Sequence, residues 1–404
     1  MRRIDPDAFR IARRGTSREI NRQIALNLVR AKEPISRADL ARVMGLRRGA
    51  VSLLVSELLR SGLVFEGAKG ESKRGRKPMH LHIETRRRFV VAVDISSSRT
   101  SLLPTDVLGH PLLAVTELPT GRQPQALIKE LVRQIGRIRR EHPEFGECVG
   151  VGIAVSGMVD RERGRLSYSP TLGWRDVDLV EPLKTATKLP VVLENSIKAC
   201  LLAQVWALGA DGPGAGPIAF VHVSDGVGVG IAVDGKLLRG VHSIAGELGH
   251  MPLSMQGPRC SCGQSGCWEA YVSNRATIAR YLGTDPSWPA SAAPQEVKVA
   301  DIIARARAGE GRALDTLRET GSYIGRGLAT VVKAVDPRRI YLEGEITAGW
   351  ELVEPAVREV LRDQALIGAA GETEIQVVPL GEHILLRGAA ALVSTPAFAA
   401  PIVA

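Results

Sequence analysis

The chain has 404 residues, of which 45% are hydrophobic and 24% are charged, a composition typical of soluble globular proteins. This length suits a small domain joined to a larger domain of two lobes. The N-terminal sequence MRRIDPDAFRIARRG has no apolar segment of the kind that a secretory signal requires. The uncharged stretch 388–404 is too short, and too interrupted by proline, to span a bilayer. We therefore expect a cytoplasmic protein without a membrane partner.

The net charge of +10 is unevenly distributed along the chain. Residues 1–88 contain 22 lysines and arginines against 9 acidic residues, whereas residues 89–404 contain 31 against 34. Such an asymmetry is typical of a basic nucleic-acid-binding segment attached to a neutral body. The alternative is a basic tail that only keeps the protein soluble.

The pattern within residues 20–62 predicts a helix-turn-helix. Residues 20–31 form an apolar-periodic helix with Ile24 and Leu28 on one face. Ser36 stands where the N-cap of a second helix belongs, and Gly45 ends that helix. A third helix follows, with the spacing of a core-facing stripe at Val51, Leu54, Val55, Leu58 and Leu59. Two helices joined by a tight turn containing glycine are typical of this DNA-binding motif.

A winged extension follows the third helix. A strand begins at residues 63–65, the loop GAKGESKRGRKP is basic, and MHLHI alternates as a second strand. Arginines of such a loop are suited to a narrow minor groove, and the start of the third helix is suited to the major groove. The residues expected to contact DNA are Arg37, Arg47, Arg48, Ser52, Arg74 and Arg76. A helical bundle used for protein contact is the alternative.

The pattern changes at residue 89, where FVVAVDIS predicts a buried strand. Leu127, Leu131, Ile135 and Ile138 mark a helix, and strands alternate with helices in two successive halves. We therefore predict an α/β protein in which residues 1–88 form a winged helix-turn-helix domain. Residues 89–404 would form a sensor domain of two α/β lobes with a cleft between them.

Three of the five cysteines lie within eight residues. Cys260, Cys262 and Cys267, together with His250, offer three thiolates and one imidazole, a closed ligand set suited to structural zinc. Gly263 and Gly266 allow the loop to fold tightly enough for these side chains to converge. Without an export signal, clustered cysteines favour metal ligation over disulfides; unligated buried thiols are the alternative.

Two longer segments closely resemble the ROK family (repressors, open reading frames and kinases). They are HVSDGVGVGIAVDGKLLRGVHSIAGELGHMPL and CSCGQSGCWEAYVSN, and the stretch GWRDVDLVEPLKTATKLPVVLEN resembles the segment leading into that family's sugar-binding loop. Family repressors also carry a winged helix-turn-helix. The resemblance implies an actin-like, ribonuclease-H-type sugar-kinase fold of two lobes, with sugar in the cleft and zinc anchoring the sugar-contacting loop.

The resemblance also implies which residues contact the sugar. The matching positions are Asn195, Glu247, His250 and Glu269. Carboxylates and an amide supply the acceptors and donors that hydroxyl groups need, and a zinc-bound histidine can donate from its other nitrogen. The two glutamates could instead be ordinary surface acids. We expect Trp174 to pack in a core rather than to stack on a sugar.

Four elements depart from the pattern of the family's kinases. Ser196 occupies the position of the catalytic aspartate, and a serine hydroxyl is no general base at neutral pH without its own base. Serines replace both glycines of the first phosphate loop at residues 96–97, Asp225 enters the second phosphate loop, and Glu343 replaces a glycine near the adenosine. We therefore expect no ATP-dependent kinase activity.

These observations together predict a transcription regulator, in the form of a repressor, that binds a DNA operator and senses a sugar or sugar derivative without phosphorylating it. The ligand would change the angle between the lobes, and so the spacing of two DNA-binding domains in a homodimer or homotetramer. Two alternatives remain. One is a sugar kinase with an appended DNA-binding domain, and the other is a regulator whose signal is a partner protein.

Overall fold

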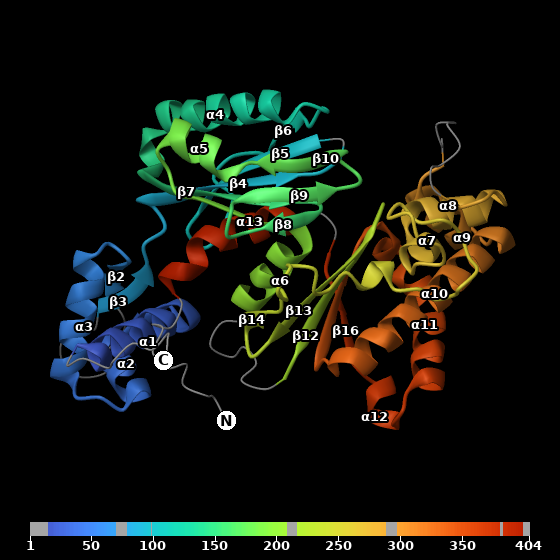
Figure 1. Ribbon diagram of the computed structural model, residues 1–404. Coiled ribbons are helices and arrows are strands. Elements are labelled where there is room, and N and C mark those ends of the chain that lie inside the picture. Colours follow the sequence, from blue (N-terminus) through green and yellow to red (C-terminus); the bar gives the residue numbers. More distant parts are fainter. Residues whose placement is uncertain are drawn as a thin grey trace.

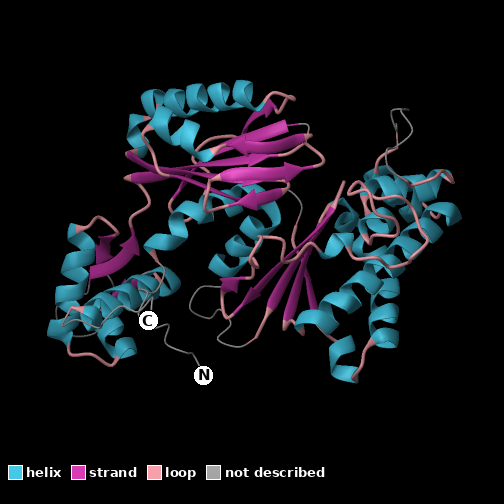
Figure 2. Ribbon diagram, viewed as in Figure 1, coloured by secondary structure: helices cyan, strands magenta, loops and turns pink. Residues whose placement is uncertain are grey.

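The computed structural model describes residues 15–69, 79–97, 99–207, 216–287, 297–379 and 383–398. Figure 1 shows a small N-terminal domain beside two larger lobes, and Figure 2 shows that each lobe is a sheet packed against helices. The expected combination of a helical N-terminal domain with two α/β lobes is confirmed. Within the described ranges, no helix is both long enough and apolar enough to cross a membrane.

In residues 15–69 and 79–83, the N-terminal domain forms three helices and a three-stranded sheet. Its elements are α1 (Thr16–Lys32), β1 (Ile35–Ser36), α2 (Arg37–Met44), α3 (Arg48–Arg60), β2 (Val64–Lys69) and β3 (Met79–Ile83). The strand order is β1-β3-β2, and β2 and β3 are antiparallel. The Ser36 side chain accepts the Asp39 backbone N–H and caps α2, and Gly45 ends α2 in the left-handed conformation. These local signals produce the helix-turn-helix that the sequence predicts.

One expectation for α1 is wrong. Ile24 is 44% exposed, whereas Ala25, Leu26 and Val29 are completely buried. Leu28, the other predicted residue, is partly buried against the same core. The buried stripe is therefore centred about one residue beyond the predicted face, and Ile24 lies at its edge. The small side chain of Ala25 allows α1 to approach its neighbours closely. A pattern of large apolar residues does not indicate such a position.

The first lobe is a five-stranded sheet with strand order β11-β7-β4-β5-β6 and a three-stranded sheet of order β10-β9-β8. Its elements are β4 (Arg88–Ile95), β5 (Arg99–Asp106), β6 (Thr116–Pro119), α4 (Pro124–Glu141), η1 (Pro143–Phe145), β7 (Glu147–Val155), β8 (Met158–Asp160), β9 (Arg165–Ser169), β10 (Trp174–Asp178), α5 (Val180–Thr187) and β11 (Val191–Asn195). Successive β4 residues face opposite sides of the sheet. Phe89 and Val91 share a core with α4 and α5, while Val90 and Ala92 pack against α13 (Ile384–Ser394).

The second lobe is a five-stranded sheet of order β14-β13-β12-β15-β16. Its elements are α6 (Ser196–Ala207), β12 (Ile218–Val223), β13 (Val227–Val233), β14 (Lys236–Leu237), η3 (Leu248–His250), α7 (Glu269–Val272), α8 (Asn274–Leu282), α9 (Val299–Arg307), α10 (Gly311–Val335), β15 (Arg339–Glu343), η4 (Glu345–Gly349), α11 (Trp350–Gln364), α12 (Gly368–Gly371) and β16 (Glu374–Val377). Val221 packs towards α10 and α11, whereas Phe220 packs towards α6.

Helices α6 and α13 pack against each other between the two sheets (Figure 1). α13 covers one face of the first-lobe sheet, and α6 covers one face of the second-lobe sheet. A side chain at Gly152 would place its Cβ 1.9 Å from the Ala389 carbonyl oxygen, so only glycine allows α13 to approach β7 this closely. The helix pair is therefore the packed connection between the lobes.

The end of the described chain crosses back to the N-terminal domain. After α13 and η5 (Thr395–Ala397), Phe398 is buried in the core of the N-terminal domain. Its backbone carbonyl accepts the Asn27 amide at 2.8 Å, and its ring packs edge-on against Trp206 of α6. The Arg30 guanidinium lies 3.9 Å from the Trp206 ring centroid and donates to the Trp206 carbonyl at 2.8 Å. Helix α6 and the segment that follows α13 thus both contact α1 directly.

Candidate functional site

The N-terminal domain presents two arginines at the start of α3. Arg47 is the N-cap residue and Arg48 the first residue of α3, and both side chains are exposed. Neither forms an ion pair with any described residue, whereas Arg37 pairs with Glu66 at 2.8 Å. Ser52 lies one turn further along α3 and is half-buried. Residues 74 and 76, the predicted wing contacts, lie outside the described residues.

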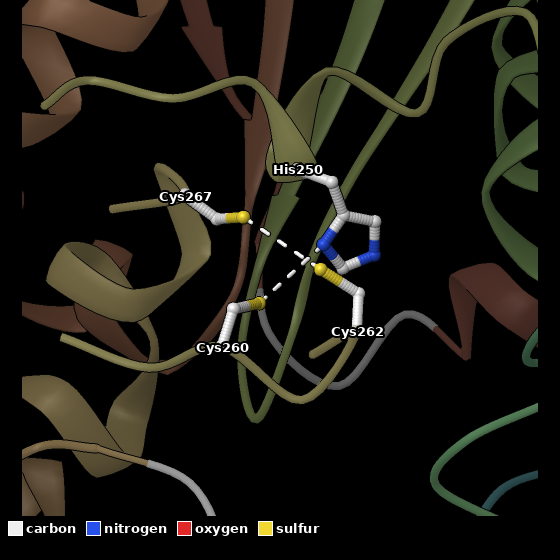
Figure 3. Close-up of side chains that lie close together, drawn as sticks. All are labelled: His250, Cys260, Cys262 and Cys267. Atoms are coloured by element: carbon white, nitrogen blue, oxygen red, sulfur yellow. Dashed lines mark hydrogen bonds between the residues drawn. The ribbon is translucent and has the colours of Figure 1, made fainter. Parts of the chain in front are cut away.

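In the second lobe, the structure brings the four predicted metal ligands together. One donor atom from each of His250, Cys260, Cys262 and Cys267 lies within 4.8 Å of the others. The Cys262 and Cys267 sulfurs are 3.7 Å apart, and the Cys260 sulfur is 3.5 Å from His250 Nδ1. Figure 3 shows these donors converging on one point, while Nε2 of His250 points away from the thiols. This group could hold a metal ion.

The backbone of the metal loop, residues 258–267, explains this convergence. Gly263 and Gly266 have φ angles of 90° and 73°, which favour glycine. A Cβ at Gly266 would lie 1.9 Å from the Ser254 carbonyl oxygen. The loop closes on itself because the Cys260 N–H donates to the Gln264 carbonyl at 2.8 Å. The two glycines therefore do what the sequence predicts for them.

Glu269 ties the metal loop to the β12–β13 turn. Its side chain is 7% exposed. Oε1 accepts the Ser261 hydroxyl at 2.7 Å and the Cys260 thiol at 3.4 Å, while Oε2 accepts the Val227 N–H at 3.1 Å. A buried carboxylate requires such donors. Glu269 is thus not a surface acid, and it positions the loop in addition to any ligand contact.

The other predicted sugar contacts come from both lobes. Glu247 precedes η3 beside His250, and burial raises the pKa of its carboxyl above the ordinary value. Asn195 ends β11 of the first lobe, where its Oδ1 accepts the backbone N–H groups of Ile197 and Lys198 and caps α6. Its Nδ2 donates to the Gly157 carbonyl at 2.9 Å. Asn195 is therefore rigidly held at the start of α6.

Lys198 is a functional candidate that the sequence reasoning missed. The side chain is 3% exposed, and its ammonium donates to the Ser243 carbonyl in the loop before Glu247. Burial lowers its pKa below the ordinary value. Nearby, Glu194 accepts Arg239 at 2.9 Å. The spacing of Lys198 from Asn195, about one helical turn, is the signal that could have identified it.

The residues expected near a nucleotide form an acidic cluster. Asp94, at the end of β4, is 5% exposed and accepts the Ser96 hydroxyl through Oδ2 at 2.8 Å. Its Oδ1 has no hydrogen-bond partner in the described part of the chain. Burial raises the pKa of Asp94 to about 6. A carboxylate without a cation in contact is a poor neighbour for phosphate.

Further carboxylates lie at or just after the C-terminal ends of β12 and β15. Glu343 pairs with His222 on the neighbouring strand. Burial acts to lower the His222 pKa, but the carboxylate outweighs it, and the pKa is raised overall. Glu345 accepts the Ser224 hydroxyl at 3.1 Å, and Asp225 accepts the Asn274 side-chain amide at 3.4 Å.

Trp174 is 3% exposed in the first-lobe core, as expected for a packing residue.

Comparisons with known proteins show two kinds of relative. The xylose repressor of Bacillus subtilis (strain 168) is 28% identical over 382 residues, which cover 93% of this chain and 95% of the repressor. The glucokinase of Streptomyces coelicolor is 29% identical over 319 residues, which cover 76% of this chain and 98% of the kinase. A crystal structure described as a ROK family transcriptional regulator, a homologue of the E. coli MLC protein, matches with a TM-score of 0.77 and 25% identity. That match covers 95% of this chain and 97% of the other.

The repressor and the regulator structure match nearly the whole chain, including most of the region before residue 92, whereas the kinase matches only three quarters of it. The family model named ROK matches residues 92–395, which span both lobes, the metal loop and α13. The chain therefore belongs to the ROK family.

Proposed function

We propose that this protein is a sugar-responsive transcription regulator, acting as a repressor, that binds operator DNA and releases it when a sugar binds between the lobes. The observation that carries the proposal is the direct contact of α6, and of Phe398 after α13, with α1, which connects a DNA-binding domain to the predicted sugar contacts. The full-length match to a xylose repressor supports the same function. The proposed domains are residues 1–88 and 89–404, and the proposed location is the cytoplasm.

DNA binding is proposed to use the start of α3 and the wing. Arg47 and Arg48 are exposed where the N-terminus of a recognition helix meets base edges and phosphates. Arg74 and Arg76 would reach the adjacent groove. Because Arg37 already pairs with Glu66, its contribution to DNA affinity is expected to be smaller than that of the two α3 arginines.

Zinc is the metal that best fits the His–Cys₃ group. Tetrahedral zinc with Zn–S bonds near 2.3 Å and Zn–N bonds near 2.0 Å requires S···S distances of about 3.8 Å and S···N distances of about 3.5 Å. The observed distances of 3.7 Å for Cys262–Cys267 and 3.5 Å for Cys260–His250 agree with both. With all four ligands from the protein, the ion would be structural, and it would hold His250 with Nε2 free to donate.

The sugar is proposed to contact Asn195, Glu247, His250 and Glu269. Asn195 belongs to the first lobe and the other three to the second, so a ligand touching both sets would fix the angle between the lobes. Phosphorylation is not expected. The residue after Asn195 is Ser196 rather than a base, serines occupy positions 96–97 of the first phosphate loop, and the carboxylates of Asp225 and Glu343 stand where a triphosphate would need donors.

A change in the angle between the lobes is proposed to be transmitted to the DNA-binding domain through α6. This helix begins after the Asn195 cap and carries Trp206, which contacts Arg30 of α1, in its last turn. A shift of α6 would therefore move the DNA-binding domain. In a homodimer or homotetramer, it would change the spacing of the two recognition helices that read a palindromic site.

Operator binding tests the proposal most simply. Replacing Arg47 and Arg48 with alanine should weaken binding to a selected operator by about 1–3 kcal/mol per lost base contact, measured by fluorescence anisotropy. Arg161→Ala, which removes an exposed arginine of the first lobe, is the matched control and should leave affinity unchanged. Equal affinity of the Arg47→Ala/Arg48→Ala protein and the wild type would refute the assignment of α3.

A screen of sugars separates the proposed function from a regulator that responds to a partner protein. A bound sugar at a hundred times its dissociation constant should raise the free energy of unfolding by about 2.7 kcal/mol. If no sugar or sugar phosphate binds at millimolar concentration, the sugar-responsive part of the proposal fails.

A further inference from the structure

The outward face of α3 carries a large apolar side chain that packing against the described residues does not explain. Val51, Leu54, Val55 and Leu58 are at most 5% exposed, whereas Leu53 is 63% exposed. Single exposed leucines are common on protein surfaces, so exposure alone assigns no role. On a helix that enters the major groove, however, the same exposure places the side chain against base edges.

The neighbours of Leu53 offer little hydrogen bonding to such edges. Gly49 and Ala50, one turn earlier on the same face, are exposed and carry no polar side-chain atoms. The Ser56 hydroxyl, on the same side of the helix, donates back to the Ser52 carbonyl at 2.8 Å. A Cβ added at Gly49 would meet nothing within 4 Å, so this part of α3 is slender. The Glu57 carboxylate, one turn after Leu53, is paired with Arg18 of α1. Ser52 therefore remains the polar neighbour of Leu53 that is expected to contact DNA, and the turn before Leu53 is short and apolar.

The major groove presents one apolar group, the 5-methyl of thymine, among hydrogen-bond donors and acceptors. A leucine lying over any other base edge would cover polar atoms without pairing them, which is unfavourable. We propose that Leu53 is a specificity-determining residue that selects an A·T base pair in each operator half-site by packing against the thymine methyl group. The inference rests on the proposed function, because it requires α3 to lie in the major groove.

The experiment begins with selection of duplexes from a randomised pool by the full-length protein. Each thymine of the selected half-site is then replaced by deoxyuridine, which removes only the methyl group. One replacement per half-site should weaken wild-type binding about fourfold, the effect of one methyl group removed from an apolar contact. Leu53→Ala should bind more weakly and should not respond to that replacement.

Leu366→Ala is the matched control, since Leu366 is 82% exposed and follows α11 in the second lobe. It should keep both the affinity and the deoxyuridine response of the wild type. Deoxyuridine effects of the same size in wild type and Leu53→Ala, or none at all, would overturn the role of Leu53 while leaving DNA binding intact. Failure to select any duplex, or selection that does not depend on Arg47 and Arg48, would instead overturn the proposed function.

Discussion

On the metal-loop side of the second lobe, each oxygen of the Glu269 carboxylate has a donor, and the thiols, imidazole and carboxylate form one connected group. The phosphate side, as we call the acidic residues expected near a nucleotide, includes Asp94 of the first lobe, which is equally buried. One oxygen of the Asp94 carboxylate has no partner among the described residues, and burial raises its pKa to about 6. Glu343, which is also on the phosphate side, pairs with His222 of the neighbouring strand. Both sides contain buried acids, but only the first is arranged to hold a defined geometry.

The difference indicates which of the two sides is preorganised to hold a ligand. A preorganised set of acceptors can bind hydroxyl groups without moving. The carboxylates of Asp225 and Glu343, which the sequence places near an expected nucleotide, disfavour the negative charge of ATP. The comparison therefore favours ligand binding without phosphate transfer, and substitutions on the two sides should have different effects.

Removing the metal should have the largest effect. Cys267→Ser takes away one of four ligands, so the ion should be lost and the free energy of unfolding should fall by more than about 3 kcal/mol. Metal analysis and denaturant unfolding measure the two effects. Cys148→Ser, at a buried cysteine outside the group, should keep one metal ion per chain. A variant that loses the ion yet unfolds like the wild type would show that the metal is not structural.

Asp94→Asn should stabilise the protein in a pH-dependent way. Because the folded-state pKa of Asp94 lies above the ordinary value of 3.8, the carboxyl costs nothing below pH 3.8 and destabilises the fold increasingly as pH rises to about 6. The substitution should therefore add up to about 3 kcal/mol at pH 7.5 and almost nothing at pH 4. Denaturant unfolding at both pH values tests this, with exposed Asp363→Asn as control. An equal effect at both pH values would contradict a buried, strained carboxyl.

Glu247→Gln should remove the response to sugar. The carboxylate is expected to accept sugar hydroxyls, so the stabilisation of about 2.7 kcal/mol at a hundredfold excess over the dissociation constant should disappear. Thermal unfolding with and without sugar measures it. Glu162→Gln, at an exposed first-lobe residue, should respond like the wild type. If Glu247→Gln keeps the full stabilisation, the sugar lies elsewhere.

Ser196→Asp should have the smallest effect, namely none on ATP turnover. Restoring a base leaves the serines at 96–97 and the carboxylates at Asp225 and Glu343 in place, so the nucleotide should still be excluded. A coupled assay of ADP release with sugar present makes the comparison with wild type. Appearance of sugar phosphate would mean that the phosphate side is still functional.

Much of the architecture could be predicted because its signals are local. The N-cap at Ser36, the left-handed Gly45 and the two-sided apolar run of β4 specify elements without reference to distant residues. The cysteine spacing likewise restricts where thiols can converge, and the structure brings them together with His250.

Other features depend on contacts between distant segments. Phe398 enters the N-terminal core from the far end of the chain, and no periodicity near it indicates that partner. The pairing of His222 with Glu343 and the contact of Lys198 with the loop before Glu247 arise only when strands and helices meet. Ile24 was misplaced because neighbouring elements, rather than helix periodicity alone, decide which stripe of α1 is buried.

The central claim is that sugar binding changes operator affinity without phosphate transfer. Operator anisotropy titrated with a sugar found by thermal shift, in the absence of ATP, measures this directly. Operator affinity should fall about 5- to 150-fold for the wild type and should be unchanged for Glu247→Gln. An operator affinity that does not respond to any bound sugar, or that responds only when ATP is added, would contradict it.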